Sequence, residues 1–180
     1  MIKLYHNMIL RPSFFNRSGI KAAKELLGKY LVRKIGNKTI VAMITEVEVY
    51  EGAKDRASHA YQGITERNYP MFGAGGRWYV YLVYGFHWML NIVTGPRNFP
   101  AAILIRAVQF INGPGRLTKF FKIGKKFNNE IANAKTGLWI EDRGIKIKKS
   151  NIMASSRVGV DYAGPIWSKK HLRFYLATTL

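Results

Sequence analysis

The sequence predicts an α+β fold, built as a single compact domain around a mostly antiparallel, curved β-sheet with peripheral helices. The chain has 180 residues, of which 48% are hydrophobic, enough for one domain with a substantial core. Segments with strand periodicity and β-branched or aromatic composition outnumber those with helical periodicity. The sequence contains no internal repeat, low-complexity tract or linker, so we expect residues 1–180 to form one domain.

The first elements predicted along the chain are a helix and a β-hairpin. Ser18, followed by apolar residues at helical spacing and then by Gly28, predicts a short N-capped helix that ends at a glycine. The segments 29–33 and 39–50 have the pattern of strands, and the turn Gly36–Asn37 separates them. This arrangement predicts two antiparallel strands.

The middle of the chain predicts a loop followed by a second pair of strands. Residues 51–77 are glycine-rich and polar, which indicates a long ordered loop or short helices over a site. The run between Arg77 and Arg97 carries no formal charge and could be mistaken for a transmembrane helix. Its first part, 78–84, is β-branched and aromatic at strand length, and Gly85 follows, so we predict strand, turn and strand.

The rest of the chain, from residue 101 onward, predicts further strands and one helix. Residues 101–108 form an apolar strand pattern, residues 112–115 a turn, and residues 117–123 a helix with lysines on one side. The strongly basic segments 143–149 and 169–173 have the pattern of strands.

The composition indicates a polyanionic partner. Lys and Arg number 29 against 10 Asp and Glu, giving a formal net charge of +19. Such a balance favours nucleic acid or an anionic membrane surface, and because the uncharged run is predicted to be strands, we expect nucleic acid and no membrane. The absence of cysteine excludes disulfides, thiol catalysis and the cysteine-ligated zinc deaminases of nucleic-acid bases. The N-terminus shows no signal-peptide pattern, and the four histidines lack zinc-ligand spacing.

A cluster of acidic residues marks the first candidate site. In a strand over residues 40–50, alternation places Ile44, Glu46, Glu48 and Tyr50 on one face, with a carboxylate and a phenol about 7 Å apart. The alternative is a solvent-exposed face of an edge strand. Four of the ten acidic residues fall within ten positions: Glu46, Glu48, Glu51 and Asp55.

Aromatic residues form a second cluster. Most must belong to the core, but tyrosines beside carboxylates in a basic protein suit stacking on a nucleobase. Tyr84 and Gly85 close a predicted strand, and an aromatic side chain at a hairpin tip is a natural wedge between base pairs. The members of this cluster are Tyr50, Tyr61, Tyr69, Phe72, Trp78, Tyr79, Tyr81, Tyr84, Phe86 and Trp88.

Six short motifs occur in a specific order and spacing along most of the chain. They are Thr45–Tyr50, His59, Tyr79–His87 with Asn91, Leu104–Ala107, Arg157–Val160 and Leu172–Tyr175.

In these motifs the sequence resembles the alkyladenine DNA glycosylases, also called 3-methyladenine or methylpurine DNA glycosylases. The resemblance implies a monofunctional enzyme of base excision repair that flips a damaged purine out of double-stranded DNA. It implies hydrolysis of the N-glycosidic bond of 3-methyladenine, 7-methylguanine, hypoxanthine or ethenoadenine, without metal or organic cofactor. It further implies a monomer that acts in the bacterial cytoplasm at the nucleoid, or in the nucleus if the source is eukaryotic.

The resemblance also implies a role for particular residues in catalysis. Glu48 matches the general base of the family, and Arg106 matches the arginine that shares the nucleophilic water with it. Cleavage of an N-glycosidic bond builds positive charge on the sugar, so a fixed carboxylate both stabilises that charge and takes the proton of the water.

Other matched residues bind the nucleotide. Tyr50, His59 and Tyr81 match the side chains that sandwich the flipped base. Tyr84, on a protruding hairpin that enters the minor groove, matches the wedge that fills the vacated space in the duplex. Asn91 matches the asparagine that disfavours the exocyclic amino group of normal guanine.

Two other classes of protein fit the residues taken alone. A metal-dependent nuclease could use Glu46, Glu48 and Glu51 as magnesium ligands in a basic groove. A ribosomal or architectural nucleic-acid-binding protein would also be small and basic, although the acid cluster and the many tyrosines argue against it.

Overall fold

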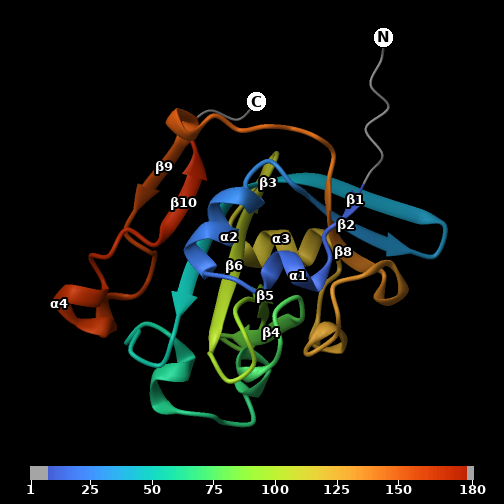
Figure 1. The fold of residues 1–180 in the computed structure, drawn as a ribbon. Helices are drawn as coiled ribbons and strands as arrows, with labels where there is room; N and C mark the ends of the chain where they lie inside the picture. The colour runs from blue at the N-terminus through green and yellow to red at the C-terminus, as the bar shows by residue number, and fades with distance from the viewer. Residues whose placement is uncertain (1–7, 178–180) are drawn as a thin grey trace.

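A long twisted antiparallel sheet organises residues 8–177, the part of the chain that the computed structural model describes (Figure 1). Its strands are paired in the order β1-β8-β2-β3-β6-β5-β4, with β10 pairing with both β3 and β9, and β7 with β6. The β2–β3 hairpin extends at one side of the molecule, and β9, β10 and α4 lie together at the other. The strands are β1 Met8–Ile9, β2 Tyr30–Ile35, β3 Lys38–Glu51, β4 Trp78–Val83, β5 His87–Val93, β6 Ala101–Val108, β7 Ile111–Asn112, β8 Leu138–Asp142, β9 Ile152–Ser155 and β10 Arg173–Leu176.

Short helices connect and cover the strands. The α-helices are α1 Pro12–Phe15, α2 Gly19–Leu26, α3 Pro114–Phe120 and α4 Gly164–Trp167. The 3-10 helices are η1 His59–Gln62, η2 Tyr69–Phe72, η3 Lys125–Phe127, η4 Ala134–Thr136, η5 Lys149–Asn151 and η6 Asp161–Ala163. The described helices include none that is long and apolar enough to cross a membrane, and the uncharged run after Arg77 forms β4 and β5, as predicted.

The two faces of strand β3 contact two different hydrophobic clusters. Val47 and Val49 pack in the main hydrophobic core, together with Leu26 of α2. The intervening Glu48 and Tyr50 project to the opposite face, because side chains alternate along a strand. On that face, Tyr50 packs against a second, smaller hydrophobic cluster, to which strands β4, β5 and β6 contribute.

The alternation holds for Glu46, Glu48 and Tyr50, but the prediction for Ile44 is wrong. The register between β3 and β6 shifts on both sides of Glu46, so the strands are locally bulged there. A bulge moves the alternation by one residue. Ile44 and its partner Val108 therefore both lie in the main core, fully buried, on the side of Val47.

Helix α2 begins where the sequence predicts, but its cap differs. Ser18 occupies the N-cap position without a side-chain hydrogen bond. Instead, Oε1 of Glu51 accepts a hydrogen bond from the free N–H of Gly19, at 2.7 Å. A carboxylate at this end satisfies an unpaired backbone donor and complements the helix dipole. Gly28, with φ of 85°, then turns the chain into β2, as predicted.

Three other predictions need correction. The helix predicted over 117–123 is α3, which ends at Phe120 and starts at Pro114, because a proline suits the first turn of a helix. Residues 143–149 contain no strand, since Ile145 and Ile147 pack over Gly28 without pairing. Of residues 169–173, only Arg173 belongs to a strand, the first position of β10. By contrast, residues 51–77 do form ordered loops with the short helices η1 and η2.

Candidate active site

A completely buried carboxylate, that of Glu48, lies at the centre of the candidate site. Its Oε2 accepts a hydrogen bond from the Tyr50 hydroxyl at 2.9 Å, and its Oε1 accepts one from the backbone N–H of Val158 at 2.8 Å. Nη1 of Arg106 lies 3.4 Å from the same Oε1. Three groups from three separate parts of the chain therefore hold this carboxylate in one orientation.

Arg106 is itself oriented by a second carboxylate. Its Nε donates to Oε1 of Glu46 at 2.8 Å, and Nη1 of Arg173 lies 3.2 Å from the same oxygen. These residues come from β6, β3 and β10, which lie side by side. Glu48, Arg106, Glu46 and Arg173 thus alternate in charge, and the chain of contacts fixes the guanidinium beside Glu48.

Opposing effects act on the ionisation of Glu48. Burial raises the pKa of this carboxyl above its ordinary value, while Arg106, the Val158 N–H and the Tyr50 hydroxyl lower it in part. Burial and the adjacent carboxylate hold the pKa of Tyr50 well above its ordinary value, so its hydroxyl stays protonated and donates. The site therefore stabilises a carboxylate whose basicity is increased by its removal from water.

A buried ion pair behind Tyr50 anchors the loop that carries Val158. Arg157 donates to Asp55 through Nη1 at 2.5 Å and Nη2 at 2.9 Å, and both side chains are fully buried. Nη1 also donates to the carbonyl of Val49 at 2.8 Å, and the guanidinium carbon lies 4.7 Å from the ring centre of Tyr50. This pair joins β3 to the C-terminal part of the chain and places the Val158 N–H next to Glu48.

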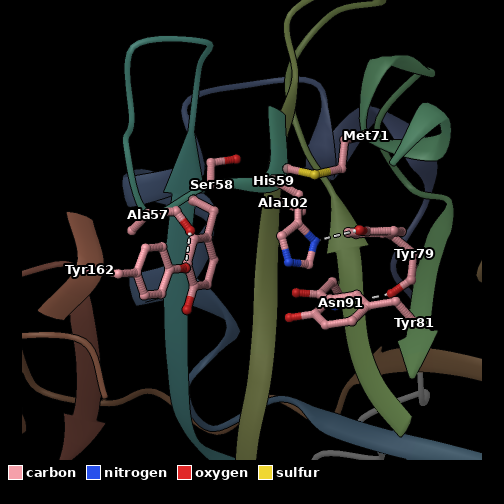
Figure 2. A pocket seen from close by; sticks show the side chains of 10 residues that line it. Ala57, Ser58, His59, Met71, Tyr79, Tyr81, Asn91, Ala102 and Tyr162 are labelled. Atoms are coloured by element: carbon pink, nitrogen blue, oxygen red, sulfur yellow. Dashed lines mark hydrogen bonds between the residues drawn. The ribbon is translucent and has the colours of Figure 1, made fainter. Parts of the chain in front are cut away.

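A pocket walled by aromatic rings opens beside Tyr50. Figure 2 shows His59, Tyr79, Tyr81 and Asn91 on one side of it, with Tyr162 and Ala57 facing them. Its free volume is about 40 Å³, room for a few water molecules at most. Glu48 does not line the pocket, but its carboxylate accepts a hydrogen bond from Tyr50, which does. The lining residues are Tyr50, Ala57, Ser58, His59, Met71, Tyr79, Tyr81, Asn91, Ala102 and Tyr162.

His59 and Tyr81 form one continuous wall. Their rings meet edge to face, with centres 4.6 Å apart. Burial and the nearby Arg67 lower the pKa of His59, so the imidazole is neutral at pH 7. Its Nδ1 lies 2.8 Å from the Tyr79 hydroxyl, which stays protonated because burial raises its pKa. The Tyr79 hydroxyl donates to Nδ1 when the ring hydrogen of His59 is on Nε2, and accepts from Nδ1–H in the other tautomer.

Asn91 and Tyr84 occupy very different surroundings. Asn91 is buried, lines the pocket and donates from Nδ2 to the carbonyl of Tyr79 at 3.1 Å. Tyr84 is 86% exposed at the tip of the β4–β5 hairpin, beside the 69% exposed Phe86. The structure thus brings Tyr50, His59, Tyr81 and Asn91 into one pocket, places Glu48 and Arg106 directly behind it, and leaves Tyr84 apart on the surface.

The acidic cluster does not converge on a metal site. Glu51 lies on the face of β3 away from Glu48 and caps α2. Glu46 is engaged by two arginines. Among residues 8–177, no three histidine or acidic side chains are grouped so that they could hold a metal ion. The arrangement therefore does not support Glu46, Glu48 and Glu51 as magnesium ligands.

Sequence reasoning missed several residues of the site. Tyr162 faces His59 across the pocket. The Val158 contact uses the backbone, which no side-chain pattern reveals. Asp55 was noted only as one of the clustered acids, and its partner Arg157 lies 102 positions away.

Comparison with known proteins places the chain in a family. A family model described as methylpurine-DNA glycosylase matches residues 13–112 and 108–179. A protein of Borreliella burgdorferi (strain ZS7), named "Putative 3-methyladenine DNA glycosylase", is 41% identical over 175 residues, covering 91% of this chain and 93% of its own length. Proteins of the same name from Anaeromyxobacter sp. (strain Fw109-5) and Methanocella arvoryzae are 40% and 39% identical over 176 residues. They cover 94% and 87% of this chain, and 89% and 86% of their own lengths.

The family match spans nearly all described residues, including every element that builds the pocket and the buried carboxylate. This chain therefore belongs to the methylpurine-DNA glycosylase family and is a DNA glycosylase.

Proposed function

We propose that the chain acts as one monomeric domain that flips alkylated or deaminated purines out of duplex DNA and removes them by hydrolysis. The proposed substrates are 3-methyladenine, 7-methylguanine, hypoxanthine and ethenoadenine. The observation that carries this proposal is the buried Glu48 carboxylate, held by three donors directly behind an aromatic pocket. Its product is an abasic site, the first intermediate of base excision repair.

In the proposed reaction, Glu48 and Arg106 act on a water molecule at the sugar. The ionised Glu48 takes the proton of the water as its oxygen bonds to C1′ of the sugar, and the N-glycosidic bond breaks with its electron pair leaving on the purine. The charge of Glu48 stabilises the positive charge that develops on the sugar. Arg106 and the Val158 N–H keep the carboxylate ionised and fixed. No step requires a metal ion or an organic cofactor.

The proposed base-binding groups favour damaged purines. Tyr50 lies on one side of the base, with His59 and Tyr81 on the other. Cationic methylated purines gain about 0.5–2 kcal/mol from such rings by cation–π attraction, and a neutral His59 adds no opposing charge. Asn91, fixed by its bond to the backbone, disfavours the exocyclic amino group of normal guanine.

The pocket must open before a purine can enter. Its free volume of about 40 Å³ is smaller than a purine base. Tyr162 is the most exposed of the lining side chains, at 71%, and its hydroxyl donates one hydrogen bond, to the carbonyl of Ala57. We propose that its displacement admits the base.

Removal of divalent metal distinguishes this proposal from a nuclease. A duplex oligonucleotide carrying a single 3-methyladenine or hypoxanthine should become sensitive to alkali at that position alone, with the same rate in EDTA as in magnesium. Loss of activity in EDTA, or cleavage at undamaged positions, would contradict the proposal. Strand breakage without alkali would reveal a lyase step.

Tyr84 is proposed as the wedge that occupies the space left by the flipped nucleotide. Substitution Tyr84→Ala should weaken binding to lesion-containing duplex by roughly tenfold, because stacking of an aromatic side chain on a base contributes about 1–3 kcal/mol. Equilibrium binding measured by fluorescence anisotropy checks this. Tyr84→Phe keeps the ring and should bind like the original chain, whereas unchanged affinity in Tyr84→Ala would remove the wedge role.

Substitution Arg106→Gln should shift the pH dependence of excision. Because the rate requires ionised Glu48, it falls as pH decreases through the pKa of that carboxyl. Arg106 lowers this pKa. Its removal should therefore move the acidic limb of the pH–rate curve, where the excision rate falls, to higher pH by roughly one unit or more. Single-turnover rates across the acidic and neutral range measure the shift. Lys38→Gln, which removes an equal charge at the distant end of β3, should leave the limb in place; an unmoved limb in Arg106→Gln would contradict the assignment.

A further inference from the structure

A polar hollow adjoins the aromatic pocket and shares three of its residues, Ser58, His59 and Tyr162. Its free volume is about 480 Å³, much larger than that of the pocket itself. It is formed mainly by η1 and the loop that follows it, up to Asn68. The lining residues are Arg56, Ser58, His59, Tyr61, Gln62, Thr65, Arg67, Asn68 and Tyr162.

The hollow is suited to an anion. Two guanidinium groups, of Arg56 and Arg67, line it together with hydroxyl and amide groups, and none of its nine lining residues is acidic. Guanidinium groups match the geometry of phosphate oxygens and form charge-assisted hydrogen bonds with them. Both arginines are exposed to solvent, so a ligand can reach them.

The wall that carries Arg67 is preorganised. Asn68 is almost fully buried, and its Nδ2 donates to the carbonyls of His59 at 2.9 Å and Gly63 at 2.8 Å. Nη2 of Arg67 donates to the carbonyl of Leu82 at 2.8 Å, and its guanidinium carbon lies 5.4 Å from the ring centre of Tyr81. Arg67 is therefore attached to a wall of the aromatic pocket and keeps donors free for a ligand.

We propose that this hollow binds a backbone phosphate next to the nucleotide whose base occupies the aromatic pocket. The proposal rests on the proposed function, because a flipped nucleotide stays joined to its strand through phosphates on either side of its sugar. With the base among His59 and its neighbours, the shared rim at Ser58 and Tyr162 directs the sugar–phosphate chain toward Arg56 and Arg67. The contact differs from general attraction to DNA, since it forms at one phosphate of the lesion strand.

Neutral phosphate analogues test this assignment. In a lesion-containing duplex, the phosphates flanking the lesion and those opposite it are replaced one at a time by uncharged methylphosphonate. The original chain should lose roughly tenfold in affinity at one flanking position of the lesion strand, the loss expected for a charge-assisted hydrogen bond. Arg56→Gln should bind the unmodified duplex about as weakly and show no further loss at that position.

Control variants separate this contact from net charge. Lys38→Gln removes one charge far from the hollow and should keep the full sensitivity to the neutral phosphate. Arg56→Lys keeps the charge and should recover part of the affinity, and thermal unfolding verifies that each variant is folded. If Arg56→Gln is as sensitive as the original chain at every position, or binds no more weakly than Lys38→Gln, the phosphate site is refuted.

Excision by the original chain distinguishes failure of the phosphate site from failure of the proposed function. If it excises the lesion from the unmodified duplex while Arg56→Gln behaves like Lys38→Gln, only the phosphate site fails. If it neither excises nor preferentially binds a lesion, the proposed function fails, and the phosphate site fails with it.

Discussion

Glu48→Gln is expected to reduce excision by roughly 10³-fold or more, because an amide cannot take the proton of the attacking water and carries no charge to stabilise the sugar cation. The substitution preserves the size and shape of the side chain, so lesion-containing duplex should bind almost as well as before. Single-turnover excision and equilibrium binding, measured on the same oligonucleotide, separate the two effects.

Stability measurements show whether the loss of excision in Glu48→Gln is a loss of catalysis and not a loss of folded protein. The folded-state pKa of Glu48 lies above its ordinary value, so the stability contributed by its protonated form is lost as pH rises through that pKa. A neutral glutamine avoids this cost, and we expect Glu48→Gln to unfold at the same temperature as the original chain or higher at neutral pH. Glu130→Gln, at an exposed acid, should retain ordinary excision. Turnover by Glu48→Gln at an ordinary rate would refute the catalytic role.

Arg157→Ala is expected to destabilise the fold by about 3–5 kcal/mol, since it leaves the Asp55 carboxyl without its partner in a fully buried position. For a domain of this size, that corresponds to a decrease of about 6–20 °C in the midpoint of thermal unfolding. Calorimetry or denaturant unfolding measures the change. Val158, the next residue, should lose its fixed position, so excision should also fall.

A double-mutant cycle isolates the ion pair from the packing of its side chains. Asp55→Ala should destabilise by a similar amount, and the double variant Asp55→Ala/Arg157→Ala by clearly less than the sum, because no charge is then left unpaired. Arg157→Lys keeps the charge but cannot bridge both carboxylate oxygens, and should recover only part of the stability. Additive effects would show that the pair is not the source of the destabilisation.

The part of the site that lies on one strand could be predicted from sequence. Alternation correctly assigns Glu46, Glu48 and Tyr50 to one face, because the side-chain period of a strand is a local property. Ile44 escapes this rule, since the bulge at Glu46 depends on how β3 pairs with β6. Likewise, isoleucines at 145 and 147 alternate like those of a strand but pack over Gly28 without a partner strand.

The rest of the site depends on contacts between distant segments. Arg157 meets Asp55, and the Val158 N–H meets Glu48, across more than one hundred positions of sequence. No local pattern encodes such pairing, because it follows from the packing of β10 against β3. Tyr162 also reaches the pocket through the packing of distant segments. For this reason the tyrosines before residue 90 could be recognised from their clustering in the sequence, whereas Tyr162 could not.

The small volume of the closed pocket has a consequence for how undamaged DNA is screened. If only a fraction of molecules are open at any moment, the apparent affinity for every base is reduced by that fraction. This reduction is the same for normal and damaged purines, so it weakens the binding of both without changing the ratio of their affinities. In the proposed function, discrimination therefore rests on the contacts inside the pocket, where cationic bases gain more than neutral ones from the aromatic rings and so offset more of the free energy of opening.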